Sequence, residues 1–457
     1  MERSKQENEI PETVELLLGN RQALVDNFGL REALYTPPSR NHYPHCWLWD
    51  GAFADIVLAR EGYNREAITS FFSIVQGQRP NGMIPNMVFA PKGRKLDPER
   101  YSFMDPLKSS DYSQPPVLAL SAKEIFESLD QDDPQQAETF LRTAYPYLAK
   151  FYGYFENNRQ NGSDDPLIGV IHPHETGRDS DPTFNFFKHK LPRQGADTPQ
   201  LIDKINMAAD YTSVIALNYR QRLKGWDEQK VRRNFWVNDV MFNCVYADNL
   251  YEMANLASRL ELKQDSARFA GQASQVEQAI LNDMWFPEAR GGQGSFYALN
   301  QGAPILETSV SNLFPLVLPN LKPEQLDSIL SLFEKSFDTP YPIPSVAIDS
   351  PNYNPHYRQK GRLWDGGTWI NTNWYLVERG KQRQAVRSEL QAHPRLVQRA
   401  MTAGNKVVDS SHSLVDQGFY EFYNPETGEP YRVEHFAWSA LARLLKTQNI
   451  ATEAIAA

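Results

Sequence analysis

The sequence has few cysteines, no long apolar run and no excess of positive charge. Its 457 residues include only Cys46 and Cys244. Two cysteines are too few for a disulfide framework and lack the Cys-x-x-Cys spacing of metal sites, so a reducing compartment fits best. No segment reaches the roughly 20 apolar residues that span a membrane, and the N-terminal residues lack the apolar region of a secretory signal. We therefore expect a cytoplasmic protein without membrane contact.

The charge balance also excludes a class of partner. The 47 Lys and Arg residues face 56 Asp and Glu residues, which gives a net charge of −9. An acidic chain lacks the basic surface that binds nucleic acid. Hydrophobic residues make up 41% and charged residues 23% of the chain, which is typical of a folded protein with a large core rather than a disordered one.

Several families of catalytic motif are missing as well. The sequence contains no Ser-His-Asp order of a hydrolase triad, no glycine loop for phosphate, no His-Glu-x-x-His element and no dinucleotide fingerprint. We therefore predict neither a cofactor nor a metal ion.

Helical periodicity dominates what is present, whereas the alternation of β-strands is scarce. The predicted helices lie at 12–27, 51–61, 65–77, 115–129, 135–157, 207–224, 239–261, 264–284, 322–337, 368–379, 382–402 and 435–446. No linker divides them, so we predict one all-α domain over residues 1–457. Long loops recur between helix pairs, above all at 78–114 and 158–206, and such loops usually carry function. The pattern favours an α/α toroid whose loops gather at one mouth; an α-solenoid has similar periodicity, but no repeat is visible.

Aromatic residues reach 12% of the chain, and several stand in polar loops. Trp47 and Trp49 precede Asp50 and Gly51, and a second Trp-Asp-Gly element begins at Trp364, shortly before Trp369. Aromatic faces next to polar side chains can form a wall for a sugar or a planar ligand. The alternative is structural, with Asp50 as a helix N-cap and the tryptophans as core anchors.

Two segments present carboxylates from loops. Glu175, Asp179 and Asp181 lie within seven residues of each other in the longest polar loop. Crowded carboxylates raise one another's pKa, which suits a general acid; a cation site or an acidic surface loop are the alternatives, although the calcium-loop pattern is missing. Glu421 stands between aromatic residues that include Tyr423, either as a buried hydrogen-bonded hinge or as a catalytic base.

A third segment is basic. Residues 92–108 carry five Lys and Arg residues together with Tyr101, and Gln114 follows just before a helix that Pro115 opens. Within an acidic protein this loop could meet an anionic substrate group, or it could simply be solvated.

These elements together resemble glycoside hydrolase family 63, which is related to the trehalases. Trp49-Asp50 is similar to the family's W-D-S/G element, residues 175–180 to its E-S/T-G-x-D-S/N element, and residues 421–428 to its E-x-Y-N-P-x-T-G element. They occur in the family's order and span nearly the whole chain. The short length resembles the compact bacterial members that hydrolyse glucosylglycerate or mannosylglycerate.

The resemblance implies a single (α/α)6 barrel and an inverting α-glycosidase. Asp179 would be the general acid, Glu421 the general base, and Asp50 a ligand of sugar hydroxyls at the pocket floor. The substrate-binding residues that we expect around them are Trp47, Trp49, Tyr101, Gln114, Trp364, Trp369 and Tyr423. The expected partner is a small carbohydrate with an anionic glycerate group, and a homo-oligomer is left open.

Three other functions compete with this interpretation. The first is another small α-glucosidase that acts on trehalose or a short glucan. The second is a sugar epimerase, which shares the α/α barrel but uses histidines, for which His172, His174 and His412 are the candidates. The third is a carbohydrate-binding protein without catalysis. A glycosidase predicts that carboxylates converge in the pocket, whereas an epimerase predicts that histidines do.

Overall fold

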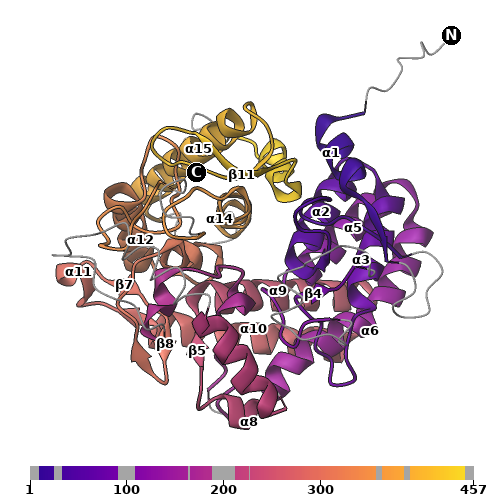
Figure 1. Ribbon diagram of the computed structural model, residues 1–457, viewed down its shortest axis with the longest axis horizontal. Coiled ribbons are helices and arrows are strands. Elements are labelled where there is room, and N and C mark those ends of the chain that lie inside the picture. The colour runs from indigo at the N-terminus through magenta and orange to yellow at the C-terminus, as the bar shows by residue number, and fades with distance from the viewer. Residues whose placement is uncertain are drawn as a thin grey trace.

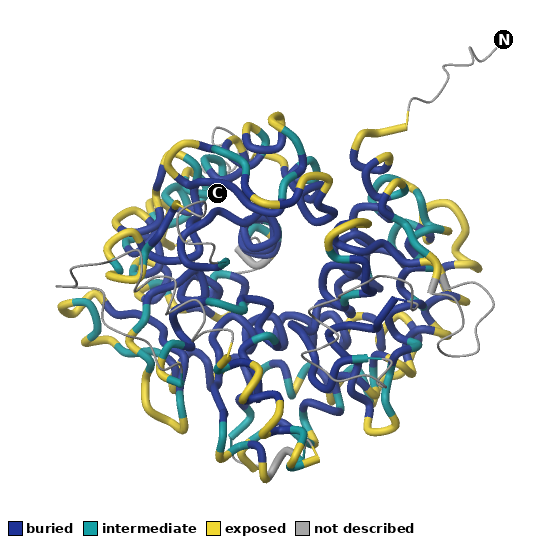
Figure 2. The backbone as a smooth tube through the Cα atoms, viewed as in Figure 1, coloured by how far each residue is buried: buried dark blue, intermediate teal, exposed yellow. Residues whose placement is uncertain are grey.

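Helices arranged in a closed ring form the body of the protein (Figure 1). The computed structural model describes residues 10–24, 33–90, 109–162, 165–187, 212–225, 227–356, 363–384 and 392–447. Buried segments lie around the centre of the ring, and exposed segments lie at its periphery (Figure 2).

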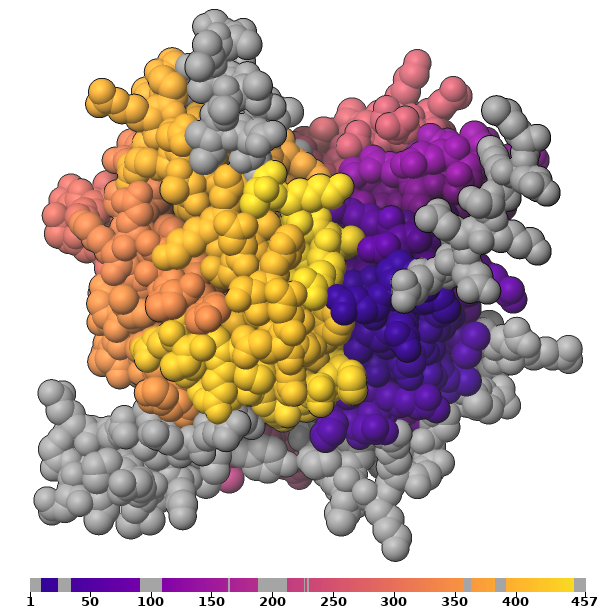
Figure 3. Space-filling view, turned by 90° about the horizontal axis from the view of Figure 1, so that it is seen from above, coloured from indigo at the N-terminus to yellow at the C-terminus, as the bar shows by residue number. Residues whose placement is uncertain are grey.

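The inner layer consists of helical segments that each contact the next one around the ring. They are α2 (Leu48–Arg60), α5 (Leu118–Asp132), α9 (Val240–Arg259), the 3₁₀ helix η3 (Val310–Val317), α14 (Ile370–Gln384) and the 3₁₀ helix η5 (Ala437–Leu444). The ring closes where η5 packs on α2, which brings the C-terminal part of the chain against the N-terminal part (Figure 3).

The outer layer packs on the inner one. It consists of α1 (Glu12–Asn20), α3 (Asn64–Val75), α6 (Pro134–Asn158), α10 (Lys263–Asp283), α12 (Pro323–Ser336) and α15 (Pro394–Val415). Inner helices are buried on all sides, as in α2, where every residue from Leu48 to Ala59 is buried. Outer helices such as α10 bury only one stripe. This is an (α/α)6 barrel, so the predicted all-α fold class is confirmed.

Short antiparallel strand pairs occupy the connections between the helices. They are β1 (Gln22–Leu24) with β2 (Ala33–Tyr35), β3 (Cys46–Trp47) with β4 (Met87–Val88), β5 (Val237–Asn238) with β8 (Leu299–Asn300) and β9 (Ala303–Pro304), β6 (Trp285–Phe286) with β7 (Ser295–Phe296), and β10 (Tyr420–Tyr423) with β11 (Pro430–Glu434). Short helices complete the described connections: η1 (Pro173–Thr176), η2 (Pro182–Phe187), a helix over 212–223, α8 (Glu228–Val231) and α11 (Ala289–Gly292).

Several predicted helix boundaries were wrong. The predicted helix 12–27 ends at Asn20, and β1 follows it. The helix that we expected Pro115 to open begins at Leu118. The predicted helix 382–402 is in fact the end of α14 followed by α15, which begins at Pro394 and extends to Val415. A proline cannot continue a helix interior but is well tolerated in its first turn, so Pro394 marks a start. Helix η3 lies where no helix was predicted, because its eight residues are too few to show a helical period.

Most of the core is one apolar cluster that extends from α1 to Leu445, just after η5, and two small apolar clusters are separate from it. A buried ion-pair network crosses it between α9 and α14. Arg379 donates to Asp248 at 2.8 and 3.0 Å and also to Glu252, while the Tyr375 hydroxyl donates to Asp248 at 2.9 Å. No helix among the described residues is long and apolar enough to cross a membrane.

We expect Arg379→Met to lower the free energy of unfolding by about 3–5 kcal/mol, because it leaves two buried carboxylates without their cation. Arg399→Gln, which removes an exposed arginine paired with Glu334 and Asp327, should cost less than about 1 kcal/mol. Urea unfolding followed by circular dichroism measures both. Equal stability of the two variants would contradict a structural role of the buried network.

Candidate active site

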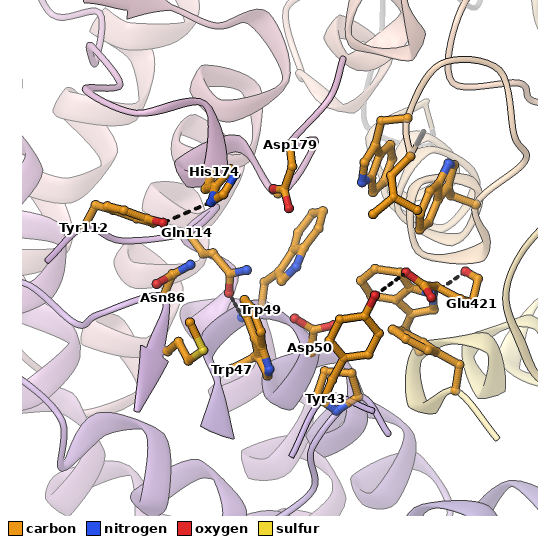
Figure 4. Close-up of a pocket in the computed structure, with 18 residues that line it drawn as sticks. Tyr43, Trp47, Trp49, Asp50, Asn86, Tyr112, Gln114, His174, Asp179 and Glu421 are labelled. Atoms are coloured by element: carbon orange, nitrogen blue, oxygen red, sulfur yellow. Dashed lines mark hydrogen bonds between the residues drawn. The ribbon is translucent and has the colours of Figure 1, made fainter. Parts of the chain in front are cut away.

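A pocket that is partly open to solvent lies at the mouth of the barrel (Figure 4). The residues that line it are Pro38, Tyr43, Trp47, Trp49, Asp50, Asn86, Met87, Tyr112, Gln114, His174, Gly177, Asp179, Leu363, Trp364, Trp369, Glu421, Phe436 and Trp438. They come from loops and element ends that are far apart in sequence.

Asp179 reaches the pocket from the loop that follows η1, and buried ion pairs hold this loop in place. The neighbouring residue Arg178 is fully buried and donates to Asp181, to Asp239 at the N-terminus of α9 and to the Ser309 hydroxyl at 3.1 Å. One arginine thereby joins the loop to two inner elements of the barrel.

A second buried pair fixes the start of the same loop. Arg159, just after α6, donates to both carboxylate oxygens of Glu175 at 2.9 and 3.0 Å. Glu175 also accepts hydrogen bonds from the backbone N–H groups of Ser113 and Ile171. Glu175 and Asp181 are therefore buried carboxylates paired with arginines, whereas Asp179 lines the pocket.

Gly177 lets this loop approach Trp49 closely. Its φ of +68° is in the left-handed region, and a Cβ atom added there would lie 2.3 Å from the Trp49 ring. Both the backbone conformation and the space require glycine. The indole of Trp49 thereby sets the position of the loop that carries Asp179.

Asp50 lies in the first turn of α2 with its side chain in the pocket. It is not the N-cap that the structural alternative predicted, because the helix begins two residues earlier. The free N–H groups of Leu48 and Trp49 donate instead to the Asn86 carbonyl at 2.9 Å and to the Gln114 Oε1 at 3.1 Å. Burial raises the pKa of the Asp50 carboxyl, and the nearby charges of Glu421 and Asp179 raise it further.

Glu421 enters the pocket from β10. Its Oε1 accepts hydrogen bonds from the Tyr43 hydroxyl at 3.0 Å and from Arg432 at 2.9 Å, and its backbone carbonyl accepts one from the Trp438 indole at 3.1 Å. Burial raises the pKa of Glu421 to about 7, although Arg432 and Tyr43 oppose the rise. The carboxylate thus titrates near neutral pH.

Aromatic rings form much of the wall. Trp364 lies 6.4 Å from Trp49 and stacks on Trp369 with ring centroids 3.9 Å apart. Trp369 also stacks on Phe422 at 4.5 Å, so much of its ring surface packs against protein. Its indole nitrogen is buried without a hydrogen-bond partner among the described residues. Trp369 therefore presents less open ring face for stacking than we expected.

The other end of the pocket is polar. There, Asn86, Gln114, Tyr112 and His174 lie together, and the Tyr112 hydroxyl is hydrogen-bonded to His174 Nδ1 at 3.0 Å (Figure 4). His172 stacks behind Tyr112 with ring centroids 4.4 Å apart, and burial lowers its pKa. The described pocket lining therefore contains three carboxylates and a single histidine, which is the convergence expected of a hydrolase and not of an epimerase.

Most of the residues singled out from the sequence meet in this pocket. These are Trp47, Trp49, Asp50, Gln114, Asp179, Trp364, Trp369 and Glu421. Tyr423 does not line it, because its hydroxyl is turned to the Gly418 carbonyl and the Tyr420 N–H. Tyr101 and the basic residues of 92–108 lie outside the described residues.

Several lining residues were not predicted from the sequence, among them Tyr43, Tyr112, Phe436 and Trp438. Tyr43 lies in a loop without a distinctive motif, and Trp438 lies in a segment that we interpreted as an amphipathic helix. Only contacts between distant segments place them here, so nothing in the local sequence identified them.

An (α/α)6 barrel whose mouth presents three carboxylates and an aromatic wall defines the class of protein as a glycoside hydrolase. Comparison with known families agrees. Residues 43–439 match the model of the mannosylglycerate hydrolase MGH1-like glycoside hydrolase domain, and the chain belongs to this family. The resemblance to glycoside hydrolase family 63 is thereby confirmed.

Individual relatives are similar over nearly their whole length. A mannosylglycerate hydrolase of Thermus thermophilus is 26% identical over 91% of this chain and 97% of its own. A glucosylglycerate hydrolase of Mycolicibacterium hassiacum is 24% identical over 88% and 91%. The crystal structure of a family 63 mannosylglycerate hydrolase of Thermus thermophilus, in complex with Tris and D-glycerate, superimposes with a TM-score of 0.75 at 24% identity, over 94% of this chain and 98% of that one.

We expect Gly177→Ala to reduce hydrolysis on the order of 100-fold, since a displacement of about 1 Å at a reacting group can cost that much. The added methyl would push the Asp179 loop away from Trp49. Gly62→Ala is the matched control, because Gly62 has a similar φ of +80° but open space around it. The control should retain activity and lose only about 1–2 kcal/mol of stability. Equal activity of both variants would show that the contact with Trp49 does not position the loop.

Proposed function

We propose that this protein is an inverting α-glycosidase that hydrolyses a small α-glucoside or α-mannoside, with glucosylglycerate or mannosylglycerate as the favoured substrates. The observation that carries the proposal is that Asp179 and Glu421 enter one pocket from different sides, with Asp50 beside them (Figure 4). Two carboxyl groups on either side of a glycosidic bond are what its hydrolysis requires.

In this mechanism Asp179 is the general acid. It donates its proton to the glycosidic oxygen as the bond from that oxygen to the anomeric carbon breaks. A water molecule attacks the anomeric carbon from the opposite face, and Glu421 accepts the proton of that water. The products are a sugar of inverted anomeric configuration and the free aglycone. The two carboxyl groups should lie about 6.5–9.5 Å apart to leave room for the water.

Sugar binding would fall to the remaining lining residues. We propose that Asp50 accepts hydrogen bonds from sugar hydroxyls, and that Trp47, Trp49 and Trp364 cover the ring. The buried indole nitrogens of Trp47 and Trp369 lack partners among the described residues, which supports their role as donors to a ligand. Buried donors without a partner are costly, and a bound hydroxyl would satisfy them.

The aglycone would occupy the polar end beside Asn86, Tyr112 and His174. The described lining contains no Lys or Arg, so a glycerate carboxylate would meet His174 there. The glycerate conjugates are favoured because similar proteins are named for them.

Both cysteines are buried free thiols, which supports a reducing compartment such as the cytoplasm. We also propose that the chain acts as one catalytic domain.

The direct test is a panel of α-glucosides and α-mannosides that includes both glycerate conjugates, trehalose and short glucans, followed by proton NMR. We expect hydrolysis of a glycerate conjugate, with release of the inverted anomer of the sugar. Retained configuration would overturn the inverting mechanism, and hydrolysis of trehalose or glucans alone would overturn the proposed substrate. If none of the substrates is hydrolysed, a carbohydrate-binding protein without catalysis would be favoured.

Asp179→Asn and Glu421→Gln are the matching variants for this assay. Each should lower kcat by about 100-fold or more, because each removes a proton donor or acceptor that acts in the transition state. The fold should remain, since the amides are nearly isosteric with the carboxyl groups. A variant that keeps most of its activity would remove that residue from the mechanism.

The pH dependence follows from the buried base. Glu421 must be ionised to accept a proton, and its pKa is raised to about 7. We therefore expect kcat/KM of the wild type to fall as the pH drops below about 7 and to level off above it, until a second group titrates. An acidic limb near the ordinary glutamate value of about 4.3 would contradict the burial of the base.

A further inference from the structure

Among the described residues, hydrogen-bond donors reach only one of the two carboxylate oxygens of Glu421. Oε1 accepts hydrogen bonds from both Tyr43 and Arg432, whereas Oε2 is buried and has no hydrogen-bond partner among the described residues. A buried carboxylate oxygen without a donor is costly unless a ligand or a water molecule completes it. The two oxygens are therefore not equivalent.

Arg432 reaches Glu421 from outside the pocket. It belongs to β11, is not among the lining residues, and its side chain is 32% exposed. Its guanidinium also lies over the ring of Tyr43, 5.2 Å from the centroid. Tyr43 in turn packs edge to face on Trp47 and Phe436. Arg432, Tyr43 and Oε1 form a compact cluster in which Tyr43 lines the pocket and Arg432 does not.

A bulge in the β10–β11 hairpin places Arg432 beside Glu421. The hairpin register pairs Tyr420 with Glu434 and Phe422 with Tyr431, so two residues of β11 face the single residue Glu421 in a β-bulge. Arg432 is one of these two and has a φ of +68°. The left-handed conformation is unfavourable for arginine and natural for glycine at such a bulge. A strained arginine at a bulge beside a candidate active-site carboxylate indicates that its side chain is needed there.

We propose that Arg432 is a positioning residue for the general base: with Tyr43 it holds Oε1, so that Oε2 is the oxygen that accepts the proton of the attacking water. This inference rests on the proposed function, because it assumes that Glu421 is the base. It assigns a role to a residue that does not itself touch the pocket.

Electrostatics supports the same role. The charged and titratable groups that face Glu421 are Asp50 from α2, Asp179 from the loop after η1, Tyr43 and Arg432. Among them Arg432 is the one that is cationic at neutral pH. Burial and the charge of Asp179 raise the pKa of Glu421, and Arg432 is the first cause that lowers it. After each turnover, when Glu421 carries the proton of water, Arg432 favours its release and so resets the base.

The decisive variant is Arg432→Gly. Glycine suits the left-handed backbone, so the variant should fold with unchanged or higher melting temperature while Glu421 loses its cation. We expect the acidic limb of the kcat/KM profile to move up by about one pH unit. At pH 7 this corresponds to a loss of roughly fivefold in kcat/KM, which should recover at about pH 9. KM should change little, because the sugar contacts remain.

Two further variants complete the experiment. Arg432→Lys keeps the charge without the planar fork of donors, and its acidic limb should lie between those of wild type and Arg432→Gly. Arg443→Gln removes an arginine of similar exposure that pairs with Glu12 and Asp416, and its profile should overlay that of the wild type.

A profile of folded Arg432→Gly that coincides with that of the wild type would overturn this inference. That outcome is distinct from a failure of the proposed function, which full activity of Glu421→Gln would reveal. If Glu421→Gln is inactive and Arg432→Gly is unshifted, only the role of Arg432 falls.

Discussion

The candidate site depends on two buried arginine–carboxylate connections that join one loop to the barrel. Arg159 holds Glu175 at the start of the loop, and Arg178 joins Asp181 to Asp239 at the N-terminus of α9. Separating either pair would leave buried charges without a partner, which is strongly destabilising, so the two pairs oppose displacement of this loop. Asp179 lies between the two anchors, and its direction into the pocket follows from theirs.

The three carboxylates of this loop have different surroundings. Glu175 and Asp181 are buried, are paired with arginines and accept hydrogen bonds from backbone N–H groups. Asp179, which we propose as the acid, faces the pocket instead, opposite a carboxylate whose pKa burial raises. The pocket therefore gathers three carboxyl groups, and the guanidinium of Arg432 pairs with one of them. This balance suits a reaction in which one carboxyl group gives a proton while another takes one.

Much of this could be predicted from the sequence. The helical periods at 239–261 and 264–284 correspond to α9 and α10 within two residues, because long amphipathic segments carry a strong local signal. The boundary at Pro394 was missed because the apolar period continues across it. Tyr43, Trp438 and Arg432 carried no signal, because each acts through a partner that is far away in the chain or across a bulge.

The sequence by itself determined the all-α class, the family and the set of carboxylates and tryptophans from which the site is built, because these depend on periodicity and on short motifs. The tertiary structure decided which of them face the same space. It separated Asp179 from its paired neighbours, covered the faces of Trp369, turned Tyr423 away and brought Arg432 to Glu421. These outcomes depend on which charges are buried together and which rings stack, and only the closed ring of helices fixes such long-range contacts.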